Sequence, residues 1–137
     1  MQRTLALVKP DAYAAGHHGA IAAKIQETGL RIVAMKTLQL SRAQAEGFYH
    51  VHSARPFFGD LCKFMTEGKI LALVLEGDDA IARWRGLMGP TDATKAPKDT
   101  IRGQFGTNVE RNATHGSDAT ETAAFEIGYF FAGLELV

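Results

Sequence analysis

The sequence predicts an α+β fold built on an antiparallel sheet. Apolar runs of strand length recur at residues 5–8, 31–40 and 70–75, and segments with helical spacing of apolar side chains separate them. The predicted order is strand, helix, strand, two helices, strand, helix, loop, strand and helix, which is typical of an α+β arrangement. A chain of 137 residues has the length of one globular domain, so we expect a single domain over 1–137.

The first two elements are a short buried strand and an amphipathic helix. Leu5–Val8 is a brief apolar run that Pro10 stops, because proline cannot donate a ladder hydrogen bond. Within Gly19–Gly29, Ile21 and Ile25 recur at four-residue spacing with polar residues between them. This spacing predicts a helix that ends at the second glycine.

A second strand and two short helices are expected next. Arg31–Leu40 is rich in apolar and β-branched side chains without helical spacing, which predicts a strand. Ser41 and Gln44 have the spacing of a capping box, so we expect a helix that runs to about His50. Proline is tolerated at a first helical position, and Pro56–Met65 is therefore predicted to form another short helix.

The most apolar strand is predicted in the middle of the chain. Ile70–Leu75 is apolar throughout, which is typical of a strand covered on both faces and central in its sheet. Asp78 or Asp79 is expected to cap the following helix, which Gly89-Pro90 ends. The apolar stripe of that helix consists of Ile81, Trp84, Leu87 and Met88.

The last third of the chain contains a long polar loop. Residues 89–100 lack periodicity, and a loop of this length in a small domain is more often functional than incidental. A weak strand at Asn108–Asn112 and a helix at Thr120–Phe131 are expected to follow. The complete order is consistent with a ferredoxin-like, four-stranded antiparallel sheet (split βαβ) that carries additional helices.

Charge and cysteine content exclude several classes of protein. Fifteen basic side chains balance fifteen acidic ones, so the broad positive field of a nucleic-acid-binding protein is absent and no stable nucleic-acid partner is expected. Cys62 is the only cysteine, which excludes an internal disulfide and fits a reducing compartment. The N-terminal apolar run stops at Lys9-Pro10, too short for a signal peptide or a membrane span, so we predict a cytoplasmic protein without membrane association.

His115 lies in the most informative segment, the polar turn Asn112–Ala119 before the last helix. A neutral imidazole has a ring nitrogen free to act as a nucleophile, and Ser117 and a carboxylate could orient the ring. Glu126, eleven residues further on, can supply that carboxylate if it lies on the following helix. The plain alternative is a structural histidine in a turn, with Ser117 and Asp118 capping the helix.

Four motifs in order make the chain similar to a known family. They are Leu7-Val8-Lys9-Pro10-Asp11, Arg55-Pro56-Phe57-Phe58, Thr100-Ile101-Arg102-Gly103 and Asn112-x-x-His115-Gly116-Ser117-Asp118. From end to end the sequence resembles the nucleoside diphosphate kinases. This resemblance implies transfer of a γ-phosphoryl group from a nucleoside triphosphate to a diphosphate, by a ping-pong mechanism through phosphorylated His115. It also implies Mg²⁺ as cofactor and assembly into a symmetric homo-oligomer.

The resemblance also implies a set of nucleotide contacts. Lys9 matches a residue that contacts ribose and phosphates, and Asn112 matches a second ribose contact. The phosphate contacts it implies are His52, Arg85, Thr91 and Arg102. For Lys9, Arg85 and Arg102, the alternative is an ordinary solvated charge at the surface. Two guanidinium forks near His115 would instead stabilise charge on the transferring phosphoryl oxygens.

The base is expected to bind in an apolar slot. The resemblance places the nucleobase on Phe57, with Val109 on its other side and Leu61 lining the cleft; a place in the core is the alternative for Phe57. A slot that uses only the π-face of a base would accept every nucleobase. Tyr49 matches a supporting tyrosine near the histidine, although a tyrosine bonded elsewhere is the common alternative.

The metal and the long loop are the least specified parts. Mg²⁺ is expected to be held mainly by nucleotide phosphates, with Asp118 reaching it through water or capping the last helix instead. Asp99 and Asp92-Ala93 depart from the family pattern, which has glycine and Asn-Pro there. The alternative function is that of a non-catalytic ferredoxin-like domain that binds nucleotides or nucleic acid for regulation. The joint presence of His115, Arg85, Arg102 and Glu126 favours the enzyme.

Overall fold

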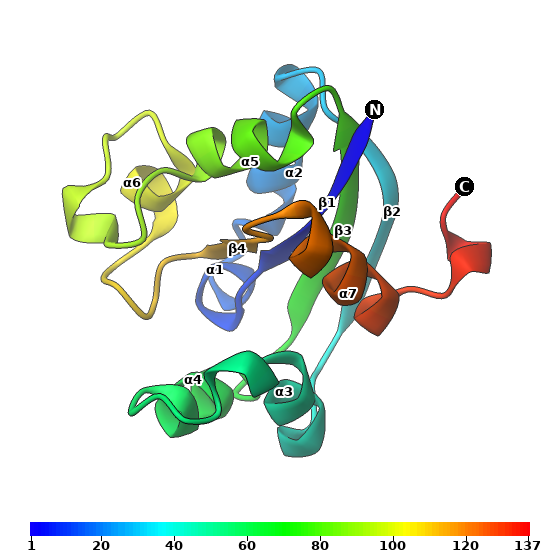
Figure 1. The fold of residues 1–137 in the computed structure, drawn as a ribbon. Coiled ribbons are helices and arrows are strands. Elements are labelled where there is room, and N and C mark those ends of the chain that lie inside the picture. The colour runs from blue at the N-terminus through cyan, green and yellow to red at the C-terminus, as the bar shows by residue number, and fades with distance from the viewer.

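Four strands lie at the centre of the computed structural model, which describes all residues 1–137 (Figure 1). They are β1 (Gln2–Val8), β2 (Arg31–Leu38), β3 (Ile70–Gly77) and β4 (Thr114–Gly116). The order in the sheet is β2-β3-β1-β4, and each pair of neighbours is antiparallel. The predicted α+β fold with a four-stranded antiparallel sheet is therefore confirmed.

Helices cover both faces of this sheet. The α-helices are α1 (Pro10–Ala14), α2 (His18–Glu27), α3 (Arg42–Phe48), α4 (Phe58–Met65), α5 (Ala80–Met88), α6 (Ile101–Phe105) and α7 (Thr120–Phe130). Single 3₁₀ turns lie at η1 (His50–His52), η2 (Ala93–Lys95) and η3 (Gly133–Glu135). None of these helices has the length and apolar character needed to cross a lipid bilayer.

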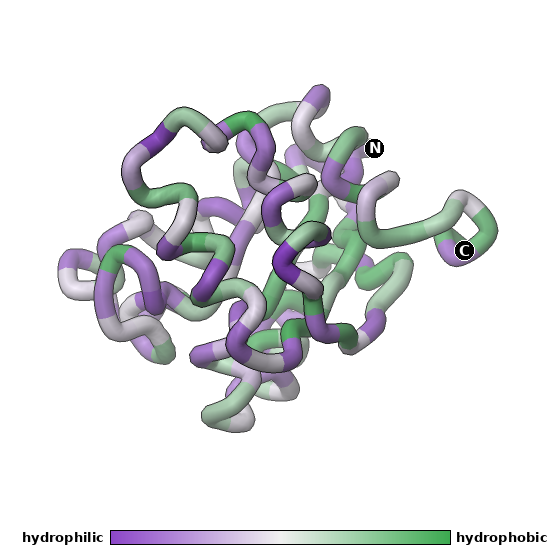
Figure 2. The backbone as a smooth tube through the Cα atoms, turned by 90° about the horizontal axis from the view of Figure 1, so that it is seen from below, coloured by the Kyte–Doolittle hydropathy of each residue, from purple (hydrophilic) through white to green (hydrophobic).

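The alternation of side chains along the strands divides the core into two clusters. Leu5 and Leu7 of β1 point to the cluster under α3, α4 and α7, whereas Ala6 and Val8 point to the cluster under α1, α2 and α5. Because successive side chains of a strand face opposite sides of a sheet and both sides are covered, Leu5–Val8 of β1 and Ile70–Leu75 of β3 are apolar throughout. In Figure 2 hydrophobic stretches of the chain run through the middle of the molecule, and the peripheral segments alternate between hydrophilic and hydrophobic residues.

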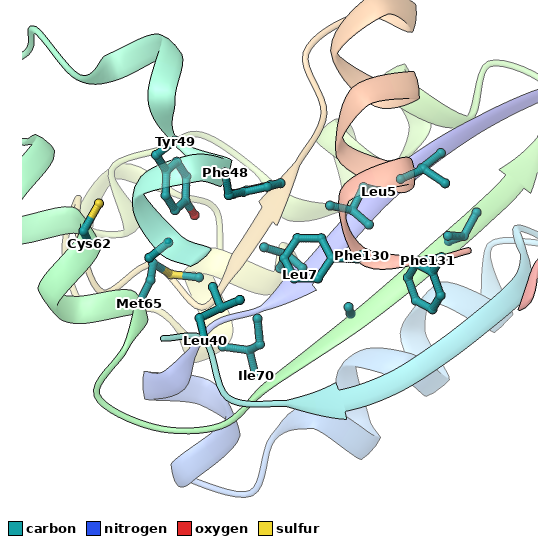
Figure 3. Close-up of a cluster of buried hydrophobic side chains, with 14 of the residues drawn as sticks. Leu5, Leu7, Leu40, Phe48, Tyr49, Cys62, Met65, Ile70, Phe130 and Phe131 are labelled. Carbon is teal, nitrogen blue, oxygen red and sulfur yellow. The ribbon is translucent and has the colours of Figure 1, made fainter. Parts of the chain in front are cut away.

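The first cluster is rich in aromatic side chains. Figure 3 shows Phe48, at the end of α3, between Tyr49 and Phe130 of α7, and the ring centroid of Phe48 lies 4.8 Å and 5.0 Å from theirs. Cys62 is fully buried in the same cluster, as expected for a small core residue. This packing fixes the end of α3 against α7, and both elements contribute to the candidate site described below.

Helix α3 begins as the sequence predicts. The Ser41 hydroxyl accepts the Gln44 N–H at 3.1 Å, and the Gln44 side chain accepts the Ser41 N–H at 2.9 Å. This is a complete capping box. Helix α4 begins at Phe58, two residues after the predicted start, with Phe57 at its N-cap position.

The predicted cap of α5 is wrong. Asp79 occupies the N-cap position with φ at 52°, but its side chain makes no capping bond. The Ile81 N–H donates instead to the side-chain oxygen of Gln2, at 2.9 Å. The cap is therefore supplied by β1, which is distant in sequence and close only after the sheet has formed.

The predicted strand at 108–112 is also wrong. The side-chain oxygen of Asn108 accepts the N–H groups of Glu110 and Arg111, so this segment closes on itself as a turn. These amides are then unavailable to a neighbouring strand. Pairing with β1 starts further along the chain, at Thr114–Gly116.

Two short helices lie where the sequence predicts none. Helix α1 begins at Pro10, a residue suited to the first helical turn, although the run before this proline predicts only the end of a strand. Helix α6 begins after Thr100, whose hydroxyl accepts the Gly103 N–H at 3.1 Å. Both are only five residues long, so apolar periodicity has too few repeats to reveal them.

Replacement of Gly103 by alanine is expected to destabilise the fold. A Cβ atom there would overlap the carbonyl oxygen of Pro97, so α6 and the preceding loop must separate. We expect the free energy of unfolding in urea to fall by roughly 1–3 kcal/mol. Gly128→Ala is the matched control, because no atom lies within 4 Å of the place that its Cβ would occupy. The control should be stabilising by up to about 1 kcal/mol, and equal denaturation midpoints for both variants would contradict this account.

Candidate active site

His115 lies at the centre of β4, on the edge of the sheet next to β1. Its Cα is paired with that of Leu7, and the indole N–H of Trp84 donates to its carbonyl oxygen at 3.1 Å. The backbone of His115 is therefore fixed by β1 on one side and α5 on the other. Its side chain retains 19% exposure, which is enough for contact with a ligand.

A carboxylate and a hydroxyl orient the imidazole. Nε2 of His115 lies 2.7 Å from Oε1 of Glu126, a residue of α7. The Ser117 hydroxyl donates to the same carboxylate oxygen at 3.0 Å. Because a carboxylate accepts hydrogen bonds, the proton of a neutral ring belongs on Nε2, and Nδ1 keeps its lone pair. The structure thus brings together the three residues that the sequence linked.

Two aromatic rings of the α3 end stand beside the imidazole. The ring centroids of Phe48 and Tyr49 lie 5.5 Å and 6.3 Å from that of His115, both in edge-on geometry. The Tyr49 hydroxyl is buried and has no hydrogen-bond partner. Burial, and secondarily the charge of Glu126, raises the pKa of this phenol, so it remains a protonated donor.

Lys9 lies at the end of β1, buried rather than solvated. Its ammonium group donates to the side-chain oxygen of Asn112 at 2.9 Å. Burial, and secondarily the charge of Arg102, lowers the pKa of Lys9 to about 8. Burial of the ammonium group is unfavourable because the charge loses its contact with water, and such buried charges are typical of functional sites.

The Asn112 side chain connects Lys9 to two loop segments. Besides accepting from Lys9, its amide nitrogen donates to the carbonyl oxygens of Thr91 and Val109, at 3.0 and 3.2 Å. Asn112 is only 2% exposed. Its polar groups thus already have partners within the protein, and its contact with ribose stays a prediction.

Arg102 of α6 is buried behind the long loop. Its guanidinium donates to the carbonyl oxygens of Gly89 and Thr114, both at 2.9 Å. The Nε atom is buried without a partner. Burial, and secondarily the charge of Arg85, lowers the pKa of Arg102 to about 10, so the group is still charged at neutral pH.

Arg85 of α5 is exposed and forms an ion pair with Asp118. The Arg85 guanidinium donates to a carboxylate oxygen of Asp118, whose side chain is 77% exposed. The predicted capping role of Asp118 is wrong, because α7 has Ala119 at its N-cap and the Ala119 N–H donates to the hydroxyl of Thr122. Asp118 instead holds the arginine near the start of α7.

The residues expected around the base come from two segments that face each other. Phe57 at the start of α4 is 49% exposed, and Val109 in the turn after α6 is 60% exposed. Leu61 is half-buried against the first core cluster, and the rings of His52 and Phe57 lie 5.6 Å apart. Large exposed apolar side chains suit an opening that a ligand covers.

A salt bridge links these two segments. Nη1 of Arg111 lies 2.8 Å from a carboxylate oxygen of Glu67, which follows α4. The Arg111 guanidinium also lies over the ring of Phe64, at 4.9 Å from its centroid. The turn that carries Val109 is thereby attached to the end of α4, the helix that Phe57 precedes.

The long loop is ordered by one of the residues that depart from the family pattern. The Asp92 carboxylate accepts the N–H and the hydroxyl of Thr94, at 3.0 and 2.7 Å, and so caps η2. These two bonds lower the pKa of Asp92. Thr91 precedes this cap with an exposed side chain, and Asp99 is exposed near the end of the loop.

Three contributors to the site were missed from the sequence. In the sequence, Phe48 and Trp84 cannot be distinguished from ordinary core residues. Their contacts with His115 exist only in the folded protein. Asp11 belongs to a quoted motif, but its partner, the N–H of Ala113, is 102 positions away. No group of three histidine, cysteine, aspartate or glutamate side chains converges to hold a metal ion.

Comparisons with known proteins agree on one family. A family model described as nucleoside diphosphate kinase matches residues 2–136. A nucleoside diphosphate kinase of Syntrophotalea carbinolica is 58% identical over 137 residues, covering 100% of both chains. One from Acidiphilium cryptum is 54% identical over 136 residues, covering 99% of this chain and 97% of that one.

Solved structures are similar along nearly the whole chain. The nucleoside diphosphate kinase of Aquifex aeolicus has a TM-score of 0.97 and 45% identity, with 99% of each chain covered. The Halobacterium salinarum enzyme in complex with CDP has a TM-score of 0.95 and 39% identity, with 99% of this chain and 91% of that one covered. The chain therefore belongs to the nucleoside diphosphate kinase family.

Proposed function

We propose that His115 carries the phosphoryl group in the nucleoside diphosphate kinase reaction. Nδ1 attacks the γ-phosphorus of a nucleoside triphosphate, a P–N bond forms, and the bond to the β,γ-bridging oxygen breaks. The diphosphate leaves with that oxygen. A terminal phosphate oxygen of a second diphosphate then attacks the phosphohistidine and restores the free ring.

The hydrogen bond between His115 and Glu126 is the observation that carries this proposal. At 2.7 Å it fixes the proton on Nε2 and leaves Nδ1 as the nucleophile. As Nδ1 bonds to phosphorus the ring becomes positively charged, and the Glu126 carboxylate stabilises that charge. Ser117 holds the carboxylate in place through its 3.0 Å bond.

The cations near the histidine are proposed to bind the polyphosphate. Arg85 and Arg102 lie close enough for the charge of one to lower the pKa of the other. Two adjacent guanidinium groups are unfavourable alone and favourable around a polyanion. We assign the phosphates to these arginines, to Lys9 and to the hydroxyl of Thr91, with His52 as a further contact. Tyr49, whose ring centroid lies 6.3 Å from that of His115, is assigned a supporting role beside the nucleophile.

The base is proposed to bind between Phe57 and Val109, with Leu61 behind it. Both outer side chains are largely exposed. Stacking on an aromatic ring does not distinguish one base from another, so broad base tolerance is expected. The CDP complex of the Halobacterium salinarum relative supports a nucleotide ligand of this general class.

Mg²⁺ is proposed to arrive with the nucleotide rather than to reside in the protein. When bound, it neutralises charge on the phosphate oxygens. The donor set fits this arrangement, since no three metal-binding side chains converge. Asp118, exposed and beside Arg85, is the carboxylate that would reach the metal through a water molecule.

Loss of His115 is expected to abolish covalent labelling. With γ-labelled ATP, the wild-type chain should acquire acid-labile, base-stable label, and His115→Ala should acquire none because the nucleophile is absent. His50→Ala is the matched control, because His50 is an exposed histidine bonded to the carbonyl of Gly47. Undiminished label on His115→Ala would refute the assignment of the nucleophile.

The affinity for nucleotides is expected to fall above pH 8. Lys9 has a pKa of about 8 in the folded protein, so its charged fraction falls roughly tenfold between pH 7 and pH 9. We expect KM for nucleoside diphosphates to rise by up to the same factor, while Arg102, with a pKa of about 10, stays charged. Lys9→Gln should show a higher KM that is flat over this range. An identical pH profile for wild type and Lys9→Gln would contradict the role of Lys9.

A homo-oligomer is also proposed. Strand β2 lies at an edge of the sheet, where backbone groups lack a partner strand. Large apolar side chains are exposed on β2, on α7 and in the C-terminal segment. They are Met35 of β2, Phe125 and Tyr129 of α7, and Leu134 and Val137 near the C-terminus. We expect light scattering to give a mass that is a multiple of the 14.8 kDa chain. A mass of one chain at micromolar concentration would refute this.

A further inference from the structure

A strained turn lies directly before the proposed nucleophile. Ala113 has φ at 73°, in the left-handed region that alanine rarely adopts. The Thr114 N–H donates to the carbonyl oxygen of Asn112 at 2.9 Å, so the three residues form a γ-turn with Ala113 at its centre. A γ-turn with positive φ is rare and strained. Something in the surrounding structure must therefore hold it.

The turn sets the direction of two groups in the site. On its N-terminal side, Asn112 binds Lys9 and the loop carbonyls. On its C-terminal side, Thr114 starts β4 and places His115 opposite β1. Relaxation of Ala113 toward an ordinary conformation would rotate one side of the turn relative to the other. Nucleophile and cation would then no longer face the same ligand.

Both backbone groups of Ala113 are bonded to the segment that follows β1. The Lys9 N–H donates to the Ala113 carbonyl oxygen at 2.8 Å. The Ala113 N–H donates to Oδ2 of Asp11 at 3.1 Å. The bond from Lys9 to Ala113 joins two backbone groups, so it does not depend on the side chain of either residue. The second requires an acceptor at residue 11, placed by α1.

The Asp11 side chain makes no hydrogen bond within the helix in which it lies. Helix α1 has five residues and no side-chain cap. The other carboxylate oxygen of Asp11, Oδ1, is buried and has no partner. A buried carboxylate oxygen without a hydrogen bond is unfavourable for folding. The single side-chain hydrogen bond of Asp11 is made to the strained turn. The need to hold that turn therefore explains why a carboxylate is placed here despite its unpartnered oxygen.

We propose that Asp11 is a positioning residue that holds the Asn112–Thr114 turn and thereby aims His115. This inference rests on the proposed role of His115 and goes beyond it, because Asp11 touches neither the ring nor a ligand. What Asp11 supplies is a hydrogen-bond acceptor in a fixed place. Its negative charge has a separate effect, because it raises the pKa of Lys9 and partly opposes the effect of burial there.

Three substitutions separate the acceptor from the charge. Asp11→Asn keeps an oxygen that accepts the Ala113 N–H and removes the charge. Asp11→Glu keeps the charge and moves the oxygen by one methylene, and Asp11→Ala removes both. We expect kcat to fall by up to roughly 100-fold in Asp11→Ala, with a smaller change in KM, because a displaced nucleophile loses reactive alignment. Asp11→Asn should retain most of kcat, whereas its KM should rise because the pKa of Lys9 falls further without the Asp11 charge. Asp11→Glu should have a kcat as low as that of Asp11→Ala.

A readout that needs no activity comes from NMR. The Ala113 N–H should be protected from hydrogen exchange in wild type and Asp11→Asn, and should exchange faster in Asp11→Ala. The ¹⁵N shifts of the His115 ring should change with it, because the bond to Glu126 depends on ring orientation. Glu76→Ala is the control for loss of a partly buried carboxylate, since Glu76 binds Arg3 and Arg31 at the other end of β1 and β3. It should lower Tm and leave kcat unchanged.

Replacing Ala113 by glycine, which removes the backbone strain at this position, gives a second, independent test. Glycine adopts positive φ freely, so in an Ala113→Gly background the loss caused by Asp11→Ala should be smaller than in the wild-type background. Equal losses in the two backgrounds would overturn the proposal. A wild-type kcat in Asp11→Ala, or an Asp11→Asn as slow as Asp11→Glu, would also overturn it.

These outcomes are distinguishable from failure of the proposed function. If the wild-type chain forms no phosphohistidine, the role of His115 is wrong, whatever the Asp11 variants do. Exchange at Ala113 reports on the turn alone. Should Asp11→Ala fail to fold, the comparison of Asp11→Asn with Asp11→Glu still decides between an acceptor and a charge.

Discussion

The antiparallel pairing of β1 with β4 is the contact on which the rest of the site depends. It joins residues more than a hundred positions apart and sets His115 opposite Leu7. The ladder is short, and further bonds extend it at both ends, from Ser117 to Leu5 and from Lys9 to Ala113. Because β1 is also paired with β3 over its full length, the histidine is attached to the most buried part of the sheet.

This attachment explains how a small domain holds polar groups in unfavourable places. Lys9 and Arg102 are buried cations with lowered pKa values, and the Tyr49 hydroxyl is buried without a partner. Each reduces stability in the free protein. The two core clusters on the faces of the sheet supply the compensation. In the proposed function, a bound polyphosphate would satisfy the cations that the protein leaves unpaired.

Local rules were sufficient for the elements whose signals lie within a few residues. The capping box of Ser41 and Gln44, the buried run at Ile70–Leu75 and the end of α5 at Gly89 are such cases, because each depends on neighbours in sequence. The same rules failed at Asp79 and at 108–112. In the first case Gln2 supplies the cap, and in the second the Asn108 side chain closes a turn before any strand can form.

For the site, the amino-acid sequence alone was enough to identify the residue types present and, through four ordered motifs, the family and the expected nucleophile. It was not enough to tell which ring nitrogen is free, which partner Asp118 has, or that Asp11 reaches Ala113. Those features come from the folded arrangement, since hydrogen bonds depend on distances of about 3 Å between atoms. The bonds of His115 to Glu126 and of Ala113 to Asp11 exist only because α7 and α1 are packed against the same sheet.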